Sequence, residues 1–225
     1  MICAGVDGPN LVAEALAALR ATAAPALPPL RVTIDKRIPV AAGLGGGSAD
    51  AAAALRAANE LTGSPLDVAG LRELGAGLGA DVPSQVEPRH ALVTGTGERV
   101  EPVELEEMWF VLAPDPAGLA TADVYAEADR RGCTRAELDP GAARELAALP
   151  PAELAPRLEN DLEPAALSLC PELADRLEAL RAAGALAARV TGSGPTAFGL
   201  FAARGDAERA AAATPDSIVT TLRSR

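Results

Sequence analysis

The chain has 225 residues, 49% of them hydrophobic, and a formal net charge of −11 at pH 7. This length can bury the core of one large domain or of two small ones. The acidic balance, which no basic tract offsets, argues against a nucleic-acid or anionic-membrane partner but leaves room for a small anionic ligand. Apolar runs are shorter than the roughly 18 to 20 residues of a membrane span, and the first residues lack a signal-peptide pattern, so we expect a cytoplasmic protein.

The first half of the chain alternates helical and extended patterns. The helical patterns are "NLVAEALAALRATA", with Asn10 as a good N-cap, an alanine-rich segment that stops at Gly63, and "SPLDVAGLRELGAGLGADVP", with a glycine-broken exit. The extended patterns are "RVTIDKRIPV", which predicts a strand ending at Pro39, and "HALVTGTGERVEPV", which predicts a hairpin around Thr-Gly-Thr-Gly.

The second half predicts a different arrangement. In chain order we expect the strand "MWFVLA", a helix "TADVYAEADRR" capped by Thr121, helices between Pro151 and Ala183, two strands in "ALAARVTGSGPTAFGLFA", the helix "DAERAAAA" and the strand "SIVTTLR". Strand, helix, helix, strand, strand, helix, strand is the order of a ferredoxin-like α/β sandwich. The fold class is therefore α+β, with domains at 1–104 and 105–225.

A glycine-rich loop joins the polar strand to the alanine-rich helix. Helix N-termini attract anions through their free N–H groups and dipole, and glycines let backbone approach a phosphate closely. Ser48 could cap the helix or offer its hydroxyl to a phosphate or a metal ion. Lys36, the only lysine in the chain, stands just before the loop. Close packing of helix on sheet would also explain the glycines. Asp50 in the first helical turn would repel a phosphate, so its carboxylate would have to face away or help to hold a cation.

Two common phosphate loops do not fit this segment. A Walker loop needs Gly-Lys before Ser or Thr, whereas here Gly47 is followed directly by Ser48. A dinucleotide fingerprint follows a buried apolar strand, and the strand here is polar.

Three ordered motifs instead resemble the GHMP kinases, a family of small-molecule kinases. They are "PVAAGLGGGSADAAAAL" at Pro39–Leu55, "LGADVP" at Leu78–Pro83, and "RVTGSGPTAFGLF" at Arg189–Phe201. Together with "ENDLE" at Glu159–Glu163, they most resemble the bacterial CDP-methylerythritol kinases, which phosphorylate a cytidine-diphosphate sugar alcohol in isoprenoid-precursor (terpenoid) synthesis. The resemblance implies a two-domain fold: an incomplete N-terminal domain like domain 2 of ribosomal protein S5, and a ferredoxin-like C-terminal domain.

The resemblance also implies the roles of individual residues. Asp81 of "GADVP" is expected to be the catalytic base. Thr191, Gly192, Ser193 and Gly194 are expected to close over the site and contact substrate. ATP, with Mg²⁺, is expected to be bound by Lys36 and by the loop Pro39, Val40, Ala41, Ala42, Gly43, Leu44, Gly45, Gly46, Gly47, Ser48 and Ala49. The metal ligands stay unknown, with Ser48 one candidate.

Part of the family pattern has no counterpart in this sequence. The family begins with a further segment that carries Ala-Lys-Xaa-Asn-Leu, whose lysine works beside the catalytic aspartate, and Asp-Gly-Tyr-His, which recognises cytidine. Two hypotheses therefore stay open: an ATP-dependent kinase for CDP-methylerythritol, or a nucleotide-binding protein of the same fold with impaired catalysis. Homoserine kinase is the alternative within the kinase family.

Three cysteines, Cys3, Cys133 and Cys170, lie far apart and far from His90, the only histidine. They match neither a disulfide framework nor zinc-ligand spacing, so we expect three reduced thiols. His90 is expected to lie on the surface and to have no role.

Overall fold

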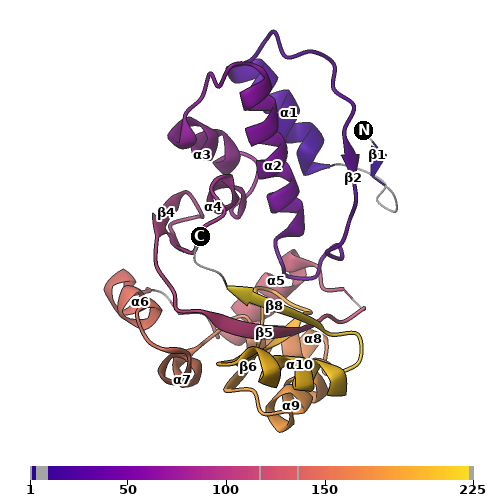
Figure 1. Cartoon of the computed structure of the whole chain (residues 1–225), viewed down its shortest axis with the longest axis vertical. Coiled ribbons are helices and arrows are strands. Elements are labelled where there is room, and N and C mark those ends of the chain that lie inside the picture. The colour runs from indigo at the N-terminus through magenta and orange to yellow at the C-terminus, as the bar shows by residue number, and fades with distance from the viewer. Residues whose placement is uncertain (1, 4–9, 117, 136, 223–225) are drawn as a thin grey trace. The chain divides into compact units, whose positions relative to one another are not determined.

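The computed structural model describes all residues except 1, 4–9, 117, 136 and 223–225. The chain divides into two compact units (Figure 1). The first unit comprises Met1–Pro39 and Gly45–Val103, and the second comprises Val40–Leu44 and Glu104–Arg225. The short segment Val40–Leu44, in the middle of the predicted ATP loop, thus packs with the second unit.

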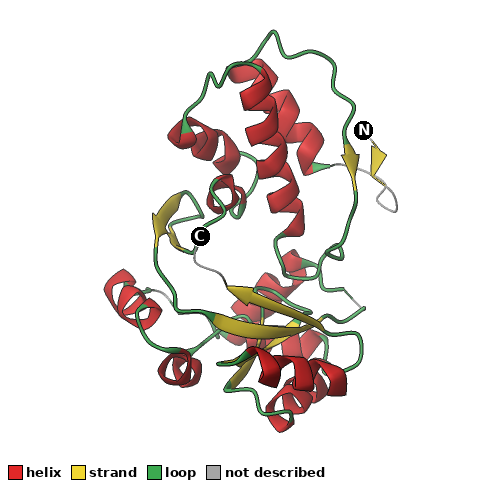
Figure 2. Cartoon of the chain, viewed as in Figure 1, coloured by secondary structure: helices red, strands yellow, loops and turns green. Residues whose placement is uncertain are grey.

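Helices make up most of the first unit (Figure 2). Its elements are β1 (Ile2–Cys3), α1 (Leu11–Thr22), β2 (Thr33–Ile34), α2 (Gly46–Leu61), α3 (Val68–Ala76), α4 (Val82–Val86), β3 (Ala91–Thr94) and β4 (Arg99–Pro102). The Asn10 side chain accepts a hydrogen bond from the N–H of Val12, which confirms the predicted cap of α1. Small and aliphatic side chains from all four helices form one core: Ala15, Leu19, Ala51, Ala52, Leu55, Ala58, Leu71, Val82 and Val86.

The predicted strand over "RVTIDKRIPV" is mostly wrong. In the part of the chain that the structure describes, only Thr33 and Ile34 of this segment pair, in parallel with Ile2 and Cys3. Asp35 and Arg37 are exposed, the opposite face is only half-buried, and Pro39 has no N–H to donate, so among the described residues the ladder does not continue beyond Ile34. The predicted hairpin is confirmed, since β3 and β4 pair antiparallel from Ala91 opposite Pro102 to Thr94 opposite Arg99.

The second unit contains a four-stranded antiparallel sheet in the order β6-β7-β5-β8. Its elements are β5 (Met108–Ala113), α5 (Thr121–Arg131), α6 (Pro140–Ala147), α7 (Pro151–Leu154), the 3₁₀ turn η1 (Ala155–Arg157), α8 (Glu163–Leu169), α9 (Leu173–Ala182), β6 (Ala187–Val190), β7 (Ala197–Phe201), α10 (Arg204–Ala213) and β8 (Ile218–Leu222). The first strand, β5, lies between the third and the fourth, which is the split βαβ order of the predicted ferredoxin-like sandwich.

Helices α9 and α10 pack on this sheet (Figure 1). Their apolar residues meet the alternate inward-facing residues of the strands, such as Val111, Val190 and Phe201, all at most 1% exposed. Thr121 is not the cap of α5, because it is the first helical residue and Ala120 precedes it without a side-chain cap bond. Among the described residues, no helix combines the length and apolarity that crossing a membrane requires.

Candidate functional site

The N-terminus of α2 presents free backbone donors. Gly45 precedes the helix in the left-handed region, at φ 65°, and its carbonyl accepts the first helical bond from Ala49 N at 3.0 Å. The N–H groups of Gly46, Gly47 and Ser48 therefore have no acceptor within the helix. Glycine is favoured at Gly45 because a side chain rarely adopts this φ.

Ser48 is not the helix cap. The helix begins two residues earlier, at Gly46, so Ser48 lies within its first turn. Its hydroxyl has no hydrogen-bond partner among the described residues, which leaves it available to a ligand. The sequence placed the helix start too late because serine is a common cap and glycine a weak helix former.

Lys36 and Asp50 form an ion pair beside this helix end. The Nζ of Lys36 donates to Oδ2 of Asp50 at 2.8 Å. Asp50 lies beyond the first turn of α2, in contrast to the prediction, because the helix starts at Gly46. Ile38 packs against Gly46, where an added Cβ would come within 3.1 Å of its side chain. An ion pair and an apolar contact, both between described residues, thus hold the segment before the loop against α2.

Within the second unit, Gly43 lies directly against the Thr191–Gly194 turn. The Thr191 hydroxyl donates to the Gly43 carbonyl at 2.8 Å. A Cβ on Gly43 would lie 2.6 Å from the Thr191 carbonyl oxygen and 2.7 Å from that of Gly194. Two predicted site segments, 148 residues apart in sequence, are therefore in contact. Ser193 is buried, and its hydroxyl lies 3.2 Å from that of Thr121.

The "ENDLE" segment holds this turn in place. The amide of Asn160 donates to the carbonyls of Val190 and Gly192, at 2.8 and 2.9 Å, while its oxygen accepts from Leu162 N. Glu163 accepts from the N–H of Val190 at 2.7 Å. The sequence motif signalled a family likeness, but its spacing alone did not reveal these contacts. They make Asn160 and Glu163 supports of the turn.

An exposed cluster of ion pairs lies next to Asn160. Arg135 pairs with Glu159 and with Asp161. Hydrogen bonds from the Arg135 side chain and backbone hold the pKa of the Asp161 carboxyl below its usual range. Because these groups are largely exposed, their ion pairs contribute little to the free energy of unfolding.

Replacing Asn160 with Asp should destabilise the protein more than replacing it with Ala. Ala leaves two carbonyls without a donor, which should lower the free energy of unfolding by roughly 1–3 kcal/mol. Asp adds repulsion between a carboxylate and two carbonyl oxygens, so its pKa should rise on folding and its extra penalty should shrink as the pH falls. Urea unfolding at neutral and acidic pH, each relative to the parent chain, measures this difference. Equal losses for both variants at neutral pH would contradict it.

Asp81 lies at the N-cap position of α4, but its side chain makes no cap hydrogen bond. The residue is exposed, and its carboxylate has no partner among the described residues. Asp81 therefore does not cap the helix, which is the usual structural role of an aspartate at this position. Asp67, by comparison, does cap α3, since its carboxylate accepts from Gly70 N at 2.8 Å.

Gly97 contacts the backbone just before Asp81, a contact that the sequence did not reveal. A Cβ built on Gly97 would lie 1.9 Å from the carbonyl oxygen of Ala80, and the glycine has φ +107°. The hairpin turn therefore packs directly on the "GADVP" segment. The only sequence signal was the Thr-Gly-Thr-Gly turn, which predicted a hairpin without indicating what it touches.

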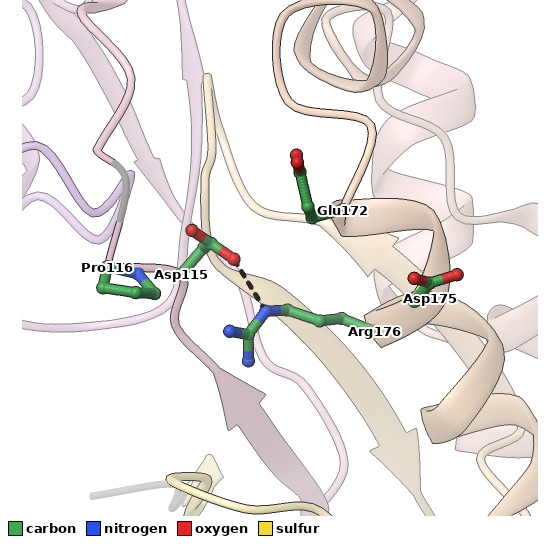
Figure 3. A pocket seen from close by; sticks show the side chains of 5 residues that line it. All are labelled: Asp115, Pro116, Glu172, Asp175 and Arg176. Carbon is green, nitrogen blue, oxygen red and sulfur yellow. Dashed lines mark hydrogen bonds and ion pairs between the residues drawn. The ribbon is translucent and has the colours of Figure 1, made fainter.

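A separate pocket of about 660 Å³ lies in the second unit and contains none of the predicted site residues (Figure 3). It is lined by Asp115, Pro116, Glu172, Asp175 and Arg176. Arg176 donates to Asp115 at 2.9 Å, so the remaining carboxylates give the pocket an acidic character that disfavours phosphate.

Cys133 and Cys170 are free thiols, as predicted, while the Cys3 side chain lies outside the described residues. Burial raises the pKa of the Cys170 thiol, as do the neighbouring Asp115 and Glu172. A buried thiol of raised pKa is poorly reactive. Among the described residues, no group of three or more His, Cys, Asp or Glu side chains could hold a metal ion.

Comparison with known proteins defines the family. Residues 10–87 match the GHMP kinase N-terminal domain, and residues 142–217 match the GHMP kinase C-terminal domain. The chain belongs to the GHMP kinases, a family of small-molecule kinases.

Individual relatives indicate which kinases of this family the chain is similar to. A 4-diphosphocytidyl-2-C-methyl-D-erythritol kinase of Rhizobium johnstonii is 44% identical over 93% of this chain and 69% of its own length. A crystal structure of 4-(cytidine 5'-diphospho)-2C-methyl-D-erythritol kinase superposes with a TM-score of 0.81 at 33% identity, over 100% of this chain and 82% of that one. A homoserine kinase from Cytophaga hutchinsonii, at 19% identity and a TM-score of 0.70, shares the fold.

Proposed function

We propose that the protein transfers the γ-phosphoryl group of ATP to the 2-hydroxyl of 4-(cytidine 5'-diphospho)-2-C-methyl-D-erythritol, a step of the methylerythritol phosphate route to isoprenoid precursors. The observation that carries this proposal is the 44% identity to a curated kinase of that name over 93% of the chain. The homoserine kinase likeness, at 19% identity, supports the fold alone. The reaction would take place in the cytoplasm.

The free N–H groups of Gly46, Gly47 and Ser48 support a phosphate-binding role for the start of α2. Asp81, with its unbonded and exposed carboxylate, is the proposed base. It accepts the proton of the 2-hydroxyl as that oxygen bonds to the γ-phosphorus and the bond to the β–γ bridging oxygen breaks, which releases ADP. The turn Thr191–Gly194 is proposed to contact substrate, with its exposed backbone at Gly192 the most accessible part.

Magnesium bound to ATP needs few protein ligands, because the phosphates and water supply most of its oxygen ligands. The Ser48 hydroxyl, free within the first turn of α2, would fit as one such ligand, whereas the Asp50 carboxylate is engaged by Lys36. When bound, the ion supplies charge neutralisation on the phosphates.

The test is ADP release by the 225-residue chain with Mg-ATP, with and without CDP-methylerythritol. We expect release that depends on this substrate and is not supported by homoserine. ATP binding without release would favour the nucleotide-binding alternative, and release supported by homoserine alone would favour homoserine kinase. A folded chain that neither binds ATP nor releases ADP would overturn the proposal.

A further inference from the structure

We propose that Lys36 promotes nucleotide binding through Asp50 and not by a bond to the nucleotide. Its ammonium neutralises the carboxylate beside the start of α2, so that this end of the helix stays attractive to phosphate. The inference rests on the proposed function, because it assumes that α2 receives the phosphates of ATP.

The Lys36–Asp50 ion pair is less exposed to solvent than the neighbouring ion pair. The side chains of Lys36 and Asp50 are 18% and 36% exposed, with a 2.8 Å separation between Nζ and Oδ2. The adjacent pair Arg37–Asp35, at 88% and 80% exposed and 3.3 Å, is almost fully in solvent. Water and salt screen a partly buried pair less than an exposed one, so the Lys36–Asp50 charges act more strongly on their surroundings.

Asp50 lies close enough to the N-terminus of α2 to affect a phosphate bound there. It follows Gly46 by four residues, which places it about 6 Å along the axis of α2. That distance is within the Debye length of about 10 Å at 0.1 M salt, so an unpaired carboxylate there would repel a phosphate at the free N–H groups. No acidic residue lies in the first turn of α2, so Asp50 is the carboxylate of α2 that lies closest to that end.

The described contacts assign the lysine to this carboxylate. Asp50 is the partner that Lys36 has among the described residues, and Ile38 packs on Gly46 two residues further along the same segment. Two other roles are conceivable: a direct bond from Lys36 to ATP, or a purely mechanical tie between the segment and the helix. Both roles predict weakened binding when both charges are removed, and they differ in Asp50→Asn, which a mechanical tie weakens and a direct bond does not.

The experiment measures the Kd of Mg-ATP by titration calorimetry for the parent chain, Lys36→Met, Asp50→Asn and the double variant. We expect Lys36→Met to weaken binding roughly 3- to 10-fold and Asp50→Asn to tighten it by a similar or smaller factor. The double variant should return to within about 2-fold of the parent, because neither charge then remains. Thermal unfolding of all four separates these effects from loss of fold, and Asp50→Asn alone tests the sign of the effect should Lys36→Met fail to fold.

Asp35→Asn and Arg37→Met are the matched controls, since they remove the same two charges from the exposed neighbouring pair. Both should stay within about 2-fold of the parent Kd. A double variant as weak as Lys36→Met would overturn the inference. It would favour a direct bond to ATP if Asp50→Asn binds ATP at least as tightly as the parent, and a mechanical tie if Asp50→Asn is weakened as well. Equal affinity in all four proteins would also overturn the inference, since the ion pair would then have no effect on nucleotide binding. A folded parent chain without measurable ATP binding would overturn the proposed function itself, a result distinct from either.

Discussion

Replacing Asp81 with Asn is expected to lower kcat by roughly 10²- to 10⁴-fold, the usual contribution of a general base. The carboxamide keeps the size of the side chain but cannot accept the proton of the substrate hydroxyl. The Kd of ATP should stay within about 2-fold of the parent, because the carboxylate is proposed to act on the acceptor and not on the nucleotide. Steady-state ADP release and titration calorimetry measure the two quantities.

Asp67→Ala is the control for this variant. Asp67 caps α3 through a 2.8 Å bond from Gly70 N, whereas the Asp81 carboxylate makes no such bond. Asp67→Ala should therefore lower the free energy of unfolding by roughly 0.5–2 kcal/mol with little change in kcat. Asp81→Asn should instead lower kcat with little change in the free energy of unfolding. Turnover that survives in Asp81→Asn would remove this residue from the role of base.

Replacing Gly97 with Ala is expected to destabilise the first unit and to reduce turnover. The new Cβ would lie 1.9 Å from the Ala80 carbonyl oxygen, so backbone must move at one of the two positions. We expect the free energy of unfolding to fall by about 2–4 kcal/mol, from overpacking together with the strained φ of +107°. Any protein that remains folded should have a lower kcat, since Ala80 directly precedes Asp81.

Gly63→Ala is the control that separates the effect of backbone strain from the effect of displacing the Ala80 backbone. Gly63 also has a positive φ, +83°, but a Cβ there would meet no atom within 4 Å. This variant should lose about 1 kcal/mol of stability and keep its kcat. Urea unfolding and ADP release should be compared for both variants. Similar stability and kcat in Gly97→Ala and Gly63→Ala would show that the contact with Ala80 does not position the "GADVP" segment.

Hydrophobic patterns, together with the cap at Asn10, were sufficient to predict the four-stranded sheet of the second unit and the longer helices of the first unit. The run "MWFVLA" became β5 because a short, uniformly apolar segment is typical of a buried strand. Asn10 began α1 as predicted, because its side-chain oxygen satisfies a free N–H group. The order of elements after β5 then predicted the ferredoxin-like sheet, since few topologies accommodate that order.

Local patterns failed where a contact with a distant segment decides the structure. Within the described residues, the strand over "RVTIDKRIPV" pairs only at Thr33 and Ile34, because pairing needs a partner strand that a local pattern does not reveal. Thr121 reads as a cap, yet its hydroxyl lies against that of Ser193. Ser48 reads as a helix start, yet Gly45, in the left-handed region, precedes the first turn.

The sequence by itself determined the family, the order of the elements apart from β1 and α6, and the three motifs rich in glycine or containing aspartate, because these depend on residue types at short spacing. Only the tertiary structure decided what those residues touch. It joined Lys36 to Asp50, brought Thr191 to Gly43, placed Gly97 against Ala80 and set Asn160 beneath the glycine turn. Each of these contacts links segments at least 14 residues apart, and such contacts depend on how whole helices and strands pack, which local patterns do not encode.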